Sequence, residues 1–235
     1  MKIILYGYGK MGKEIEKIAL ERKHEIVLKI DENNAASITK EQLSKADVAI
    51  EFTTPHTVLK NIAKCFDADL PVVVGTTGWY NEFEKIKTDC LKGNKSLFYA
   101  SNFSLGVNLF FKVNSYLAEL MNNYSVYDVS MEEIHHVHKL DKPSGTAITL
   151  ANQVLEKVKR KKNWSIDNHS PETLFIEDKR EGEVPGTHII KYRSDIDDIE
   201  IMHKAHNRKG FAFGAVIAAE FLHGKKGIFT MSDIV

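Results

Sequence analysis

Apolar stretches alternate with segments of helical periodicity through the first hundred residues. The segments between these stretches place apolar residues at helical spacing; for example, Ile15, Ile18 and Ala19 fall on one face of a helix. Apolar strands that alternate with helices are typical of a parallel sheet covered on both faces. The stretches that predict strands are Lys2–Tyr6, Ile26–Ile30, Val48–Phe52, Leu70–Val74 and Leu97–Ala100.

A helix start is predicted at Thr54-Pro55, because a capping residue followed by proline is common at the first helical position. We expect this helix to run to about Phe66. A further helix is expected between the glycines of Gly75-Thr76-Thr77-Gly78 and about Leu91.

The pattern changes after residue 103. Leucine and valine at helical spacing from Leu105 to Leu120 predict a long helix. A strand is expected at Tyr124–Ile134, a helix from Pro143 to about Arg160, and a polar connection over 161–186. Two strands at Thr187–Arg193 and Asp198–Ala205 follow. The apolar tail, Phe213–Leu222 and Ile228–Met231, predicts a helix and a strand that return to the first domain. We therefore expect one domain from residues 1–103 and 209–235, and an α+β domain from residues 104–208.

Composition narrows the class of protein. The 235 residues carry 32 Lys+Arg and 32 Asp+Glu, so the chain lacks the net basic charge of a nonspecific nucleic-acid binder. Two cysteines, Cys65 and Cys90, are too few for a disulfide framework. No apolar stretch reaches the length of a membrane span, and Met1-Lys2 leads directly into a strand, so we expect no signal peptide and a cytoplasmic protein.

A glycine-rich turn follows the first predicted strand. Gly7-Tyr8-Gly9-Lys10-Met11-Gly12 has the G-x-G-x-x-G pattern and opens a helix, which is the context of a dinucleotide-binding turn. The first glycine permits the tight turn, the second lets the pyrophosphate approach the backbone, and the third lets helix and sheet pack closely. A tight turn without a ligand is the alternative.

Asp31 ends the second predicted strand, where a carboxylate can accept hydrogen bonds from the adenosine ribose and would repel a 2′-phosphate. Glu32 follows it. The pair favours NADH at least as much as NADPH, although Lys10 and Lys29 could contact a phosphate. The alternative is that Asp31 is a solvated turn residue.

The densest group of titratable residues is Glu133-Ile134-His135-His136-Val137-His138-Lys139-Leu140-Asp141. If the strand continued through it, His135 and Val137 would face one way and His136 and His138 the other. An imidazole can donate a proton near pH 7, and Lys139 adds positive charge. The following Ser144-Gly145-Thr146, at a helix start, offers N–H and hydroxyl donors to a carboxylate.

Other interpretations of this group remain open. The histidines could ligate a metal, with His203 and His206 as a second pair, but no helical H-E-x-x-H spacing is present. Ser144 could be only an N-cap, with the histidines as surface groups. Asn102 could likewise cap the helix that follows it. We expect no bound metal.

The run His135-His136-x-His138-Lys139-x-Asp141-x-Pro143-Ser144-Gly145-Thr146-Ala147 resembles the signature of the 4-hydroxy-tetrahydrodipicolinate reductase (dihydrodipicolinate reductase) family. This motif is long and specific, and the similarity extends over essentially the whole chain. It includes the glycine loop, Phe52-Thr53, Gly75-Thr76-Thr77-Gly78, Ala100-Ser101-Asn102-Phe103-Ser104-Leu105-Gly106-Val107, Pro185-Gly186-Thr187-His188, and the run from His203 through Arg208 to Ala215.

The resemblance implies an α/β protein. A Rossmann-type parallel-sheet domain would bind the dinucleotide, and an α+β domain with a mixed sheet would bind the substrate and form a homotetramer. The reaction would be the NAD(P)H-dependent reduction of 4-hydroxy-tetrahydrodipicolinate, a small dicarboxylate, to tetrahydrodipicolinate in lysine and diaminopimelate synthesis. No nucleic acid or membrane partner is implied.

The resemblance also implies roles for residues. His135 would be the proton donor and Lys139 a second one, and the substrate would be bound by His136, Ser144, Gly145 and Thr146. The residues expected to line the cofactor are Gly7, Tyr8, Gly9, Lys10, Met11, Gly12, Asp31, Phe52, Thr53, Gly75, Thr76, Thr77, Ala100, Ser101, Asn102 and Phe103.

Three departures from the family pattern are visible. The glycine loop is one residue shorter than in many members, Lys142 stands where a small residue is common, and Asp31-Glu32 replaces the acid-then-arginine pattern of members that accept NADP. Only the last bears on function, through cofactor preference. Another Rossmann oxidoreductase and a non-catalytic nucleotide sensor are the alternative functions.

Overall fold

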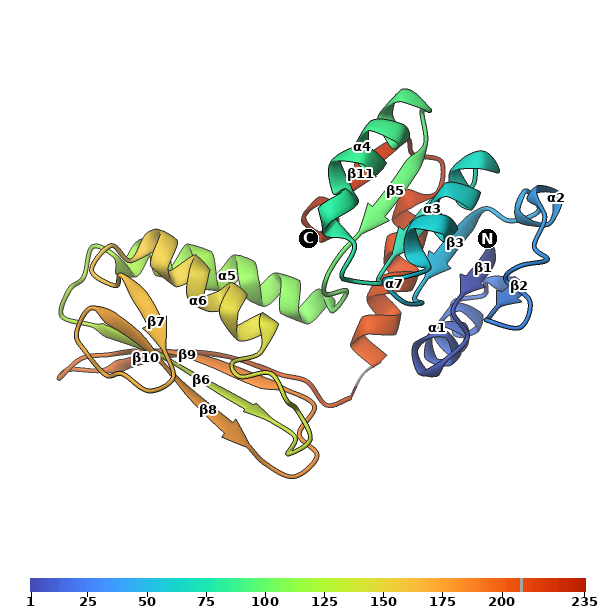
Figure 1. Ribbon diagram of the computed structural model, residues 1–235. Coiled ribbons are helices and arrows are strands. Elements are labelled where there is room, and N and C mark those ends of the chain that lie inside the picture. Colours follow the sequence, from blue (N-terminus) through green and yellow to red (C-terminus); the bar gives the residue numbers. More distant parts are fainter. Residues whose placement is uncertain (208) are drawn as a thin grey trace. The chain divides into compact units, whose positions relative to one another are not determined.

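The computed structural model describes residues 1–207 and 209–235. The chain forms two compact units (Figure 1). Unit 1 comprises Met1–Leu105 and Lys209–Val235, so both chain ends contribute to it. Unit 2 is Gly106–Arg208. Arg208, which belongs to the motif near the C-terminus, lies outside the described residues.

Unit 1 contains a six-stranded sheet in which all neighbouring strands are parallel. Its order is β11-β5-β4-β3-β1-β2, so the chain moves outward from β1 to β2 and then returns to the other side of β1 with β3. Ligands of such sheets bind beyond the carboxyl ends of the strands at this reversal. The strands are β1 (Lys2–Tyr6), β2 (Glu25–Ile30), β3 (Val48–Glu51), β4 (Val72–Val74), β5 (Ser96–Tyr99) and β11 (Gly227–Phe229).

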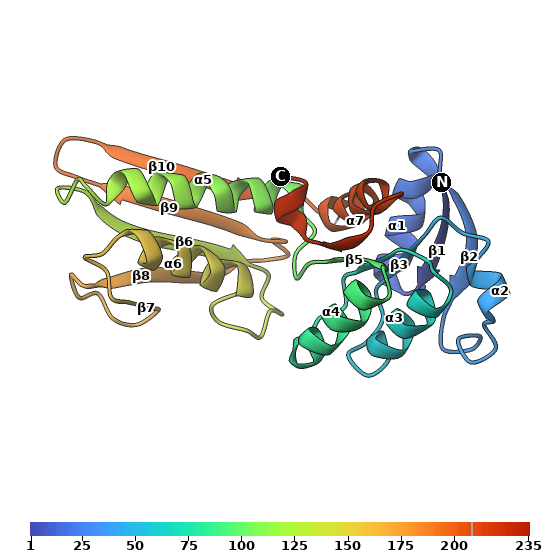
Figure 2. The same cartoon turned by 90° about the horizontal axis from the view of Figure 1, so that it is seen from above.

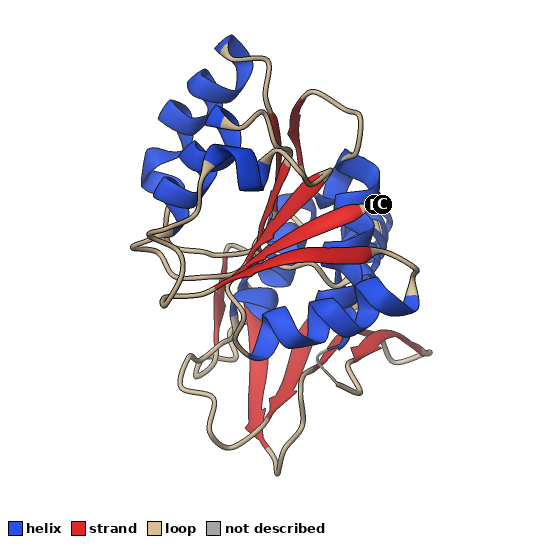
Figure 3. Cartoon of the chain, turned by 90° about the vertical axis from the view of Figure 1, so that its right-hand side faces the viewer, coloured by secondary structure: helices blue, strands red, loops and turns tan. Residues whose placement is uncertain are grey.

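Helices cover both faces of this sheet (Figures 1 and 3). Alternate strand residues such as Ile3 and Leu5 pack with α1 and α7, whereas Ile4 and Tyr6 pack with α3 and α4. This two-sided burial is why the strands are apolar throughout. The helices are α1 (Lys10–Glu21), α2 (Lys40–Leu43), α3 (Val58–Asp67), α4 (Phe83–Lys92) and α7 (Lys209–Leu222), with 3-10 turns η1 (Tyr80–Glu82) and η2 (Met231–Asp233).

Unit 2 contains a five-stranded mixed sheet in the order β10-β9-β6-β8-β7. The β6–β8 and β7–β8 pairs are parallel, and the β6–β9 and β9–β10 pairs are antiparallel. Two helices lie side by side over one face of it (Figures 1 and 2). The elements are α5 (Leu105–Met121), α6 (Gly145–Lys157), β6 (Asp128–His135), β7 (Asn163–Ser165), β8 (Thr173–Arg180), β9 (Thr187–Arg193) and β10 (Asp198–Lys204).

The expected fold class, a Rossmann-type parallel sheet with a second mixed-sheet domain, is confirmed, but several details were wrong. The polar connection expected over 161–186 contains β7 and β8. The helix expected from Pro55 begins at Val58, because 55–57 form a turn in which the carbonyl of Thr54 accepts hydrogen bonds from the Thr57 and Val58 N–H groups. The strand expected from Tyr124 begins at Asp128. Within the described residues, no helix is long and apolar enough to cross a membrane.

Candidate active site

The glycine loop connects β1 to α1, and two of its glycines are required by close backbone contacts. A Cβ at Gly7, whose φ is +90°, would lie 2.0 Å from the carbonyl oxygen of Phe52. A Cβ at Gly12 would lie 2.1 Å from the carbonyl oxygen of Gly7. A Cβ at Gly9, the N-cap of α1, would meet nothing within 4 Å. The first and third glycines thus allow packing, and the second borders open space at a helix N-terminus, where a phosphate can bind.

Two adjoining cavities lie in unit 1 at the carboxyl ends of its strands. One, of about 390 Å³, is lined by Gly9, Lys10, Met11, Gly12, Phe52, Thr53, Pro55, Gly75, Thr76 and Thr77. The other, of about 810 Å³, has among its lining Gly7, Tyr8, Gly9, Asp31, Glu32, Phe52, Thr53, Lys60 and Lys64. Gly9, Phe52 and Thr53 border both. An elongated ligand such as a dinucleotide fits cavities of this size and placement.

Asp31, which is exposed, belongs to the lining of the larger cavity. One carboxylate oxygen of Asp31 accepts a hydrogen bond from the Asn33 N–H at 2.9 Å, so Asp31 forms part of the turn after β2. Lys29 is paired within unit 1: its Nζ lies 2.6 Å from Oε1 of Glu16 and 3.2 Å from the Tyr8 hydroxyl. Glu16 also accepts the Tyr8 hydroxyl. The lining of this cavity therefore combines Asp31 and Glu32 with Lys60 and Lys64, while the charge of Lys29 is paired with Glu16.

Two threonines join the loops that follow β3 and β4. The Thr53 N–H donates to Oγ1 of Thr76 at 2.7 Å, and the Thr53 hydroxyl donates to Glu51. Glu51 is fully buried at the end of β3 and also accepts from Asn61 at 3.1 Å. Burial raises the pKa of Glu51, although hydrogen bonds from Thr53, Thr76 and Asn61 oppose the shift.

The segment after β5 lies at the same end of the sheet. Phe103 is buried against Phe52, with ring centroids 5.6 Å apart, so it supports the cavity wall from behind. Oδ1 of Asn102 accepts a hydrogen bond from the Ser104 N–H at 2.9 Å, immediately before α5. This bond closes a local turn with the residue before α5, so the capping role of Asn102 stays a prediction. Ala100, Ser101 and Asn102 line neither of the two cavities.

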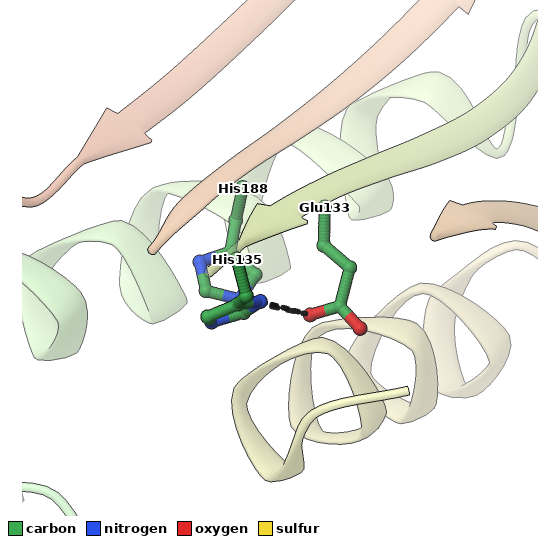
Figure 4. Close-up of side chains that lie close together, drawn as sticks. All are labelled: Glu133, His135 and His188. Atoms are coloured by element: carbon green, nitrogen blue, oxygen red, sulfur yellow. Dashed lines mark ion pairs between the residues drawn. The ribbon is translucent and has the colours of Figure 1, made fainter. Parts of the chain in front are cut away.

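In unit 2, three buried side chains meet on the helix-covered face of the sheet (Figure 4). Glu133 and His135 project from β6, and His188 is the direct cross-strand partner of Glu133 on β9. Oε2 of Glu133 lies 3.2 Å from Nδ1 of His135 and 3.4 Å from Nε2 of His188. The exposed fractions are 0%, 6% and 4% for Glu133, His135 and His188.

Ser144 links this cluster to the N-terminus of α6. It is the N-cap, and its Oγ accepts a hydrogen bond from the Ala147 N–H at 3.1 Å. Its own N–H donates to Oε1 of Glu133 at 2.7 Å, and its hydroxyl donates to Oε2 at 2.5 Å. Ser144 is therefore an N-cap, but His135 is buried and not a surface group, and Gly145, which follows Ser144, is exposed. The first turn of α6 is therefore fixed to the histidine cluster at a point that a ligand can reach.

The buried carboxylate stays ionised. Burial alone would raise the pKa of Glu133, but interactions with His135 and His188 and two hydrogen bonds from Ser144 together bring it far below its ordinary value. Burial is also the largest influence on His188, where it lowers the pKa, while Glu133 acts in the opposite direction. His188 is consequently neutral near pH 7.

The loop after β6 carries the remaining candidates. β6 ends at His135, so the alternation expected through His138 does not occur, and the rings of His136 and His138 lie with centroids 6.2 Å apart. Nζ of Lys139 lies 2.8 Å and 2.9 Å from the two carboxylate oxygens of Asp141. Asp141 also accepts, through its backbone carbonyl, a 2.8 Å hydrogen bond from Arg180. The ammonium group of Lys139 is therefore paired with a carboxylate two residues further along the same loop.

Glu133, His135 and His188 are also chemically suitable as metal ligands, because their three ligand atoms lie within 4.8 Å of one another. The second pair considered from the sequence, His203 and His206, is not part of any such group among residues 1–207 and 209–235. The same three side chains form a hydrogen-bonding cluster with Ser144, and that arrangement suits the orientation of an imidazole for proton transfer.

Sequence reasoning missed two members of the cluster. Glu133 and His188 were present in the motifs but were given no role. Glu133 was within reach of inference, because residues two apart on a strand share a face and Glu133 precedes His135 by two. His188 was not, because only the antiparallel register of β6 and β9 places it opposite Glu133.

Comparison with known proteins agrees with this architecture. Residues 1–103 match the family model described as dihydrodipicolinate reductase, N-terminus, and residues 106–235 match the one described as dihydrodipicolinate reductase, C-terminus. A protein of Christiangramia forsetii named 4-hydroxy-tetrahydrodipicolinate reductase is 50% identical over 100% of this chain and 98% of its own length. One of the same name from Neisseria meningitidis serogroup B is 34% identical over 82% of this chain and 74% of its own.

Solved structures show the same fold. A dipicolinate-bound dihydrodipicolinate reductase from a Paenisporosarcina species superposes with a TM-score of 0.81 at 22% identity, covering 100% of this chain and 99% of that one. An amine dehydrogenase from Mycobacterium smegmatis gives a TM-score of 0.56 at 11% identity, with 98% and 95% covered. With both family models matched and a relative at 50% identity, this chain belongs to the dihydrodipicolinate reductase family.

Proposed function

We propose that this chain reduces 4-hydroxy-tetrahydrodipicolinate to tetrahydrodipicolinate and water, with oxidation of NAD(P)H, in lysine and diaminopimelate synthesis. The observation that carries the proposal is the buried Glu133–His135–His188 cluster joined through Ser144 to the N-terminus of α6, in a chain with a glycine-loop cavity. A nucleotide sensor needs the glycine loop but has no use for a buried acid–base cluster.

NAD(P)H supplies a hydride to the ring when it is bound. Gly9 borders open space where the backbone N–H groups of α1 can hold the pyrophosphate, and Thr53 and Thr76 fix the loops on either side of it. We assign the remaining unit 1 candidates, including Ala100, Ser101 and Asn102, to the same dinucleotide site. Residues 1–103 and 209–235 are thus the proposed dinucleotide-binding domain.

The substrate groups come from unit 2. Reduction of an imine-conjugated ring builds up electron density that an acid must neutralise, and we assign the donation of that proton to His135. Lys139 contributes a second proton and positive charge. The carboxylates of the substrate would be held by His136, Lys139, and the N–H and hydroxyl donors of Ser144, Gly145 and Thr146. Residues 104–208 are thus the proposed substrate domain.

We further propose that NADH is used at least as well as NADPH. The support is electrostatic: Asp31 and Glu32 line the adenosine end of the cavity, and Lys29, the nearest basic residue on β2, is occupied by Glu16. A 2′-phosphate would meet two carboxylates there. A much lower KM for NADPH than for NADH would overturn this preference.

We also propose a homotetramer formed through the uncovered face of the unit 2 sheet, and a cytoplasmic location in keeping with a biosynthetic NAD(P)H-dependent reaction. Ile134, Phe175, Ile189 and Met202 face away from α5 and α6. Met202 is 60% exposed. Light scattering should give four times the 26.6 kDa chain mass, and a monomer would contradict the proposal.

The decisive experiment mixes purified chain with enzymatically prepared substrate and follows oxidation of NADH and, separately, NADPH. Turnover is expected, and His135→Ala should lower kcat by about 10²–10⁴, as for a lost general acid. His223→Ala is the control, because this exposed histidine follows α7 in unit 1. No turnover with either cofactor would reject the reductase. Full activity of His135→Ala would favour a sensor that binds NADH without catalysis.

A further inference from the structure

Glu133 neither donates the proton nor binds the substrate in the proposed reaction, although it is the most completely buried carboxylate in unit 2. Its side chain is 0% exposed, and each of its oxygens accepts from Ser144. A buried charge is costly unless it is paired. The carboxylate of Glu133 is paired with His135, the candidate acid, and with His188, and it accepts hydrogen bonds from Ser144, the first residue of the proposed substrate-binding turn.

The two imidazoles present different nitrogens to this carboxylate. His188 approaches Oε2 of Glu133 through Nε2, which also lies 3.2 Å from Oγ of Ser144, and its Nδ1 is buried without a hydrogen-bond partner in the described part of the chain. A carboxylate can only accept, so the facing nitrogen must carry the hydrogen. His188 is thus the Nε2–H tautomer, and its other nitrogen is a lone pair.

His135 approaches the same oxygen through Nδ1, at 3.2 Å. The contact is within hydrogen-bonding distance but not aligned, since no described group forms an aligned hydrogen bond with this Nδ1. Catalytic hydrogen bonds are commonly poorly aligned before substrate binds and tighten afterwards. A hydrogen on Nδ1 leaves Nε2 as the nitrogen that exchanges a proton. That atom faces Gly186, where the missing side chain leaves room beside it.

We propose that Glu133 is a positioning residue: it holds His135 in the Nδ1–H tautomer with Nε2 directed at the substrate, and through Ser144 it ties this acid to the turn that binds the substrate carboxylate. The role of its carboxylate is that of the acidic partner in a hydrolase triad, which orients an imidazole without itself transferring a proton. His188 completes the cluster as a fixed, neutral donor. The inference rests on the proposed function of His135.

The groups that face this cluster come from each element around it. They are Glu133 and His135 on β6, His188 on β9, His203 opposite it on β10, Asp178 and Arg180 on β8, Lys139 and Asp141 in the loop after β6, and Ser144 at the start of α6. Arg180 pairs with Asp178 and Lys139 with Asp141, so each of these charges already has a partner of its own. Glu133 is the only carboxylate of this set in contact with His135 among the described residues.

The first test does not depend on turnover. NMR of protein labelled with ¹⁵N-histidine distinguishes the two neutral tautomers, with His135→Asn used to assign the signals. We expect His135 as Nδ1–H in the wild type and a loss of that preference in Glu133→Gln, whose amide can present either a donor or an acceptor. Nε2–H at His135 in the wild type would overturn the proposal, whether or not the chain proves to be the reductase.

The second test uses the active protein. Glu133→Gln should lower kcat about 10- to 100-fold and leave the KM for NADH unchanged, because the imidazole of His135 loses the acceptor that fixes its tautomer and orientation. Glu133→Asp should restore part of kcat. The matched control is Glu132→Gln, whose carboxylate bonds Lys179 and Lys191 on the opposite face of the sheet. An unchanged kcat in folded Glu133→Gln, or equal losses in Glu133→Gln and Glu133→Asp, would overturn the proposal, whereas an inactive wild type would reject only the proposed function.

Discussion

Gly186 lies directly against His135: a Cβ at position 186 would stand 3.0 Å from Nε2 of the imidazole, and the backbone φ of +154° is one that other residues rarely adopt. The space beside this nitrogen is therefore maintained by glycine at a position just before β9. Gly186 has no reactive group, but its missing side chain leaves room beside Nε2 of His135, the atom that we propose exchanges the proton.

Replacement of this glycine should impair catalysis more than folding. In Gly186→Ala the new methyl group occupies space beside Nε2 of His135, so we expect kcat/KM to fall at least about 10-fold, together with about 1–3 kcal/mol of backbone strain. The dissociation constant for NADH should not change. The control is Gly182→Ala, which has a φ of +45° but open space around the new Cβ. Equal losses of activity in the two variants would show that strain, not crowding of His135, is responsible.

Cofactor preference should respond to Glu16, a residue on α1 that holds Lys29 at 2.6 Å. In Glu16→Gln the lysine loses its charged partner and becomes available to a 2′-phosphate, so the KM for NADPH should fall several-fold while that for NADH changes little. Glu14→Gln, which removes the partner of Lys17 on the same helix, is the control. A parallel change in both KM values would contradict the role given to Lys29.

Stability should depend on pH through Glu51. Its pKa in the folded chain is raised, chiefly by burial, so the folded state binds this proton more tightly than the unfolded state does. The free energy of unfolding therefore falls as pH rises from the unfolded pKa, near 4.5, through the folded value. Glutamine mimics the protonated acid.

Glu51→Gln is accordingly expected to raise Tm of the cofactor-free chain at pH 8, by about 2–4 °C for each kcal/mol gained. The gain should shrink toward pH 4.5. Thermal unfolding followed by circular dichroism at several pH values measures it, with the exposed Glu84→Gln as control. A lower Tm at pH 8 would mean that the hydrogen bonds from Thr53 and Asn61 need the charge, and the expected sign would then be wrong.

The two thiols should be unreactive in the native chain. Cys65 and Cys90 are both 0% exposed, and burial raises the pKa of each, that of Cys90 to about 11. Since the thiolate is the reactive form, iodoacetamide at pH 8 should modify neither residue before unfolding and both in guanidinium chloride. Mass spectrometry of the modified protein reads the result; rapid labelling of native Cys90 would show that α4 opens locally.

The sequence predicted unit 1 closely because β1, β3, β4 and β5 are buried on two faces, and continuous apolar runs between turn residues are typical of such strands. β8 shows where this fails. Only Leu174 and Ile176 mark its covered face, and the same face continues as Asp178 and Arg180 where the strand reaches the site. Because Asp178 and Arg180 are charged, the alternation of apolar and polar residues that would have predicted the strand stops at Ile176.

The site was predictable in part for a related reason. His135, Lys139 and Ser144 are close in sequence, so a local motif contains them. Glu133 and His188 are brought together by the pairing of β6 with β9. The register of two strands that are far apart in sequence cannot be predicted from the spacing of residues within either strand. Likewise, the occupation of Lys29 by Glu16 depends on how α1 packs beside β2, which no motif encodes.

Unit 1 is assembled from the two ends of the chain, and this has a consequence for synthesis on the ribosome. α7 packs with α1 against β3, β4 and β5, so one face of the parallel sheet has an open apolar surface until the last residues have emerged. Unit 2, continuous in sequence, can finish folding before that moment. A nascent chain that has emerged from the ribosome only as far as the end of unit 2 would therefore carry a foldable second unit beside a first unit with one exposed apolar sheet face. We expect chaperones to bind this state and not the released protein.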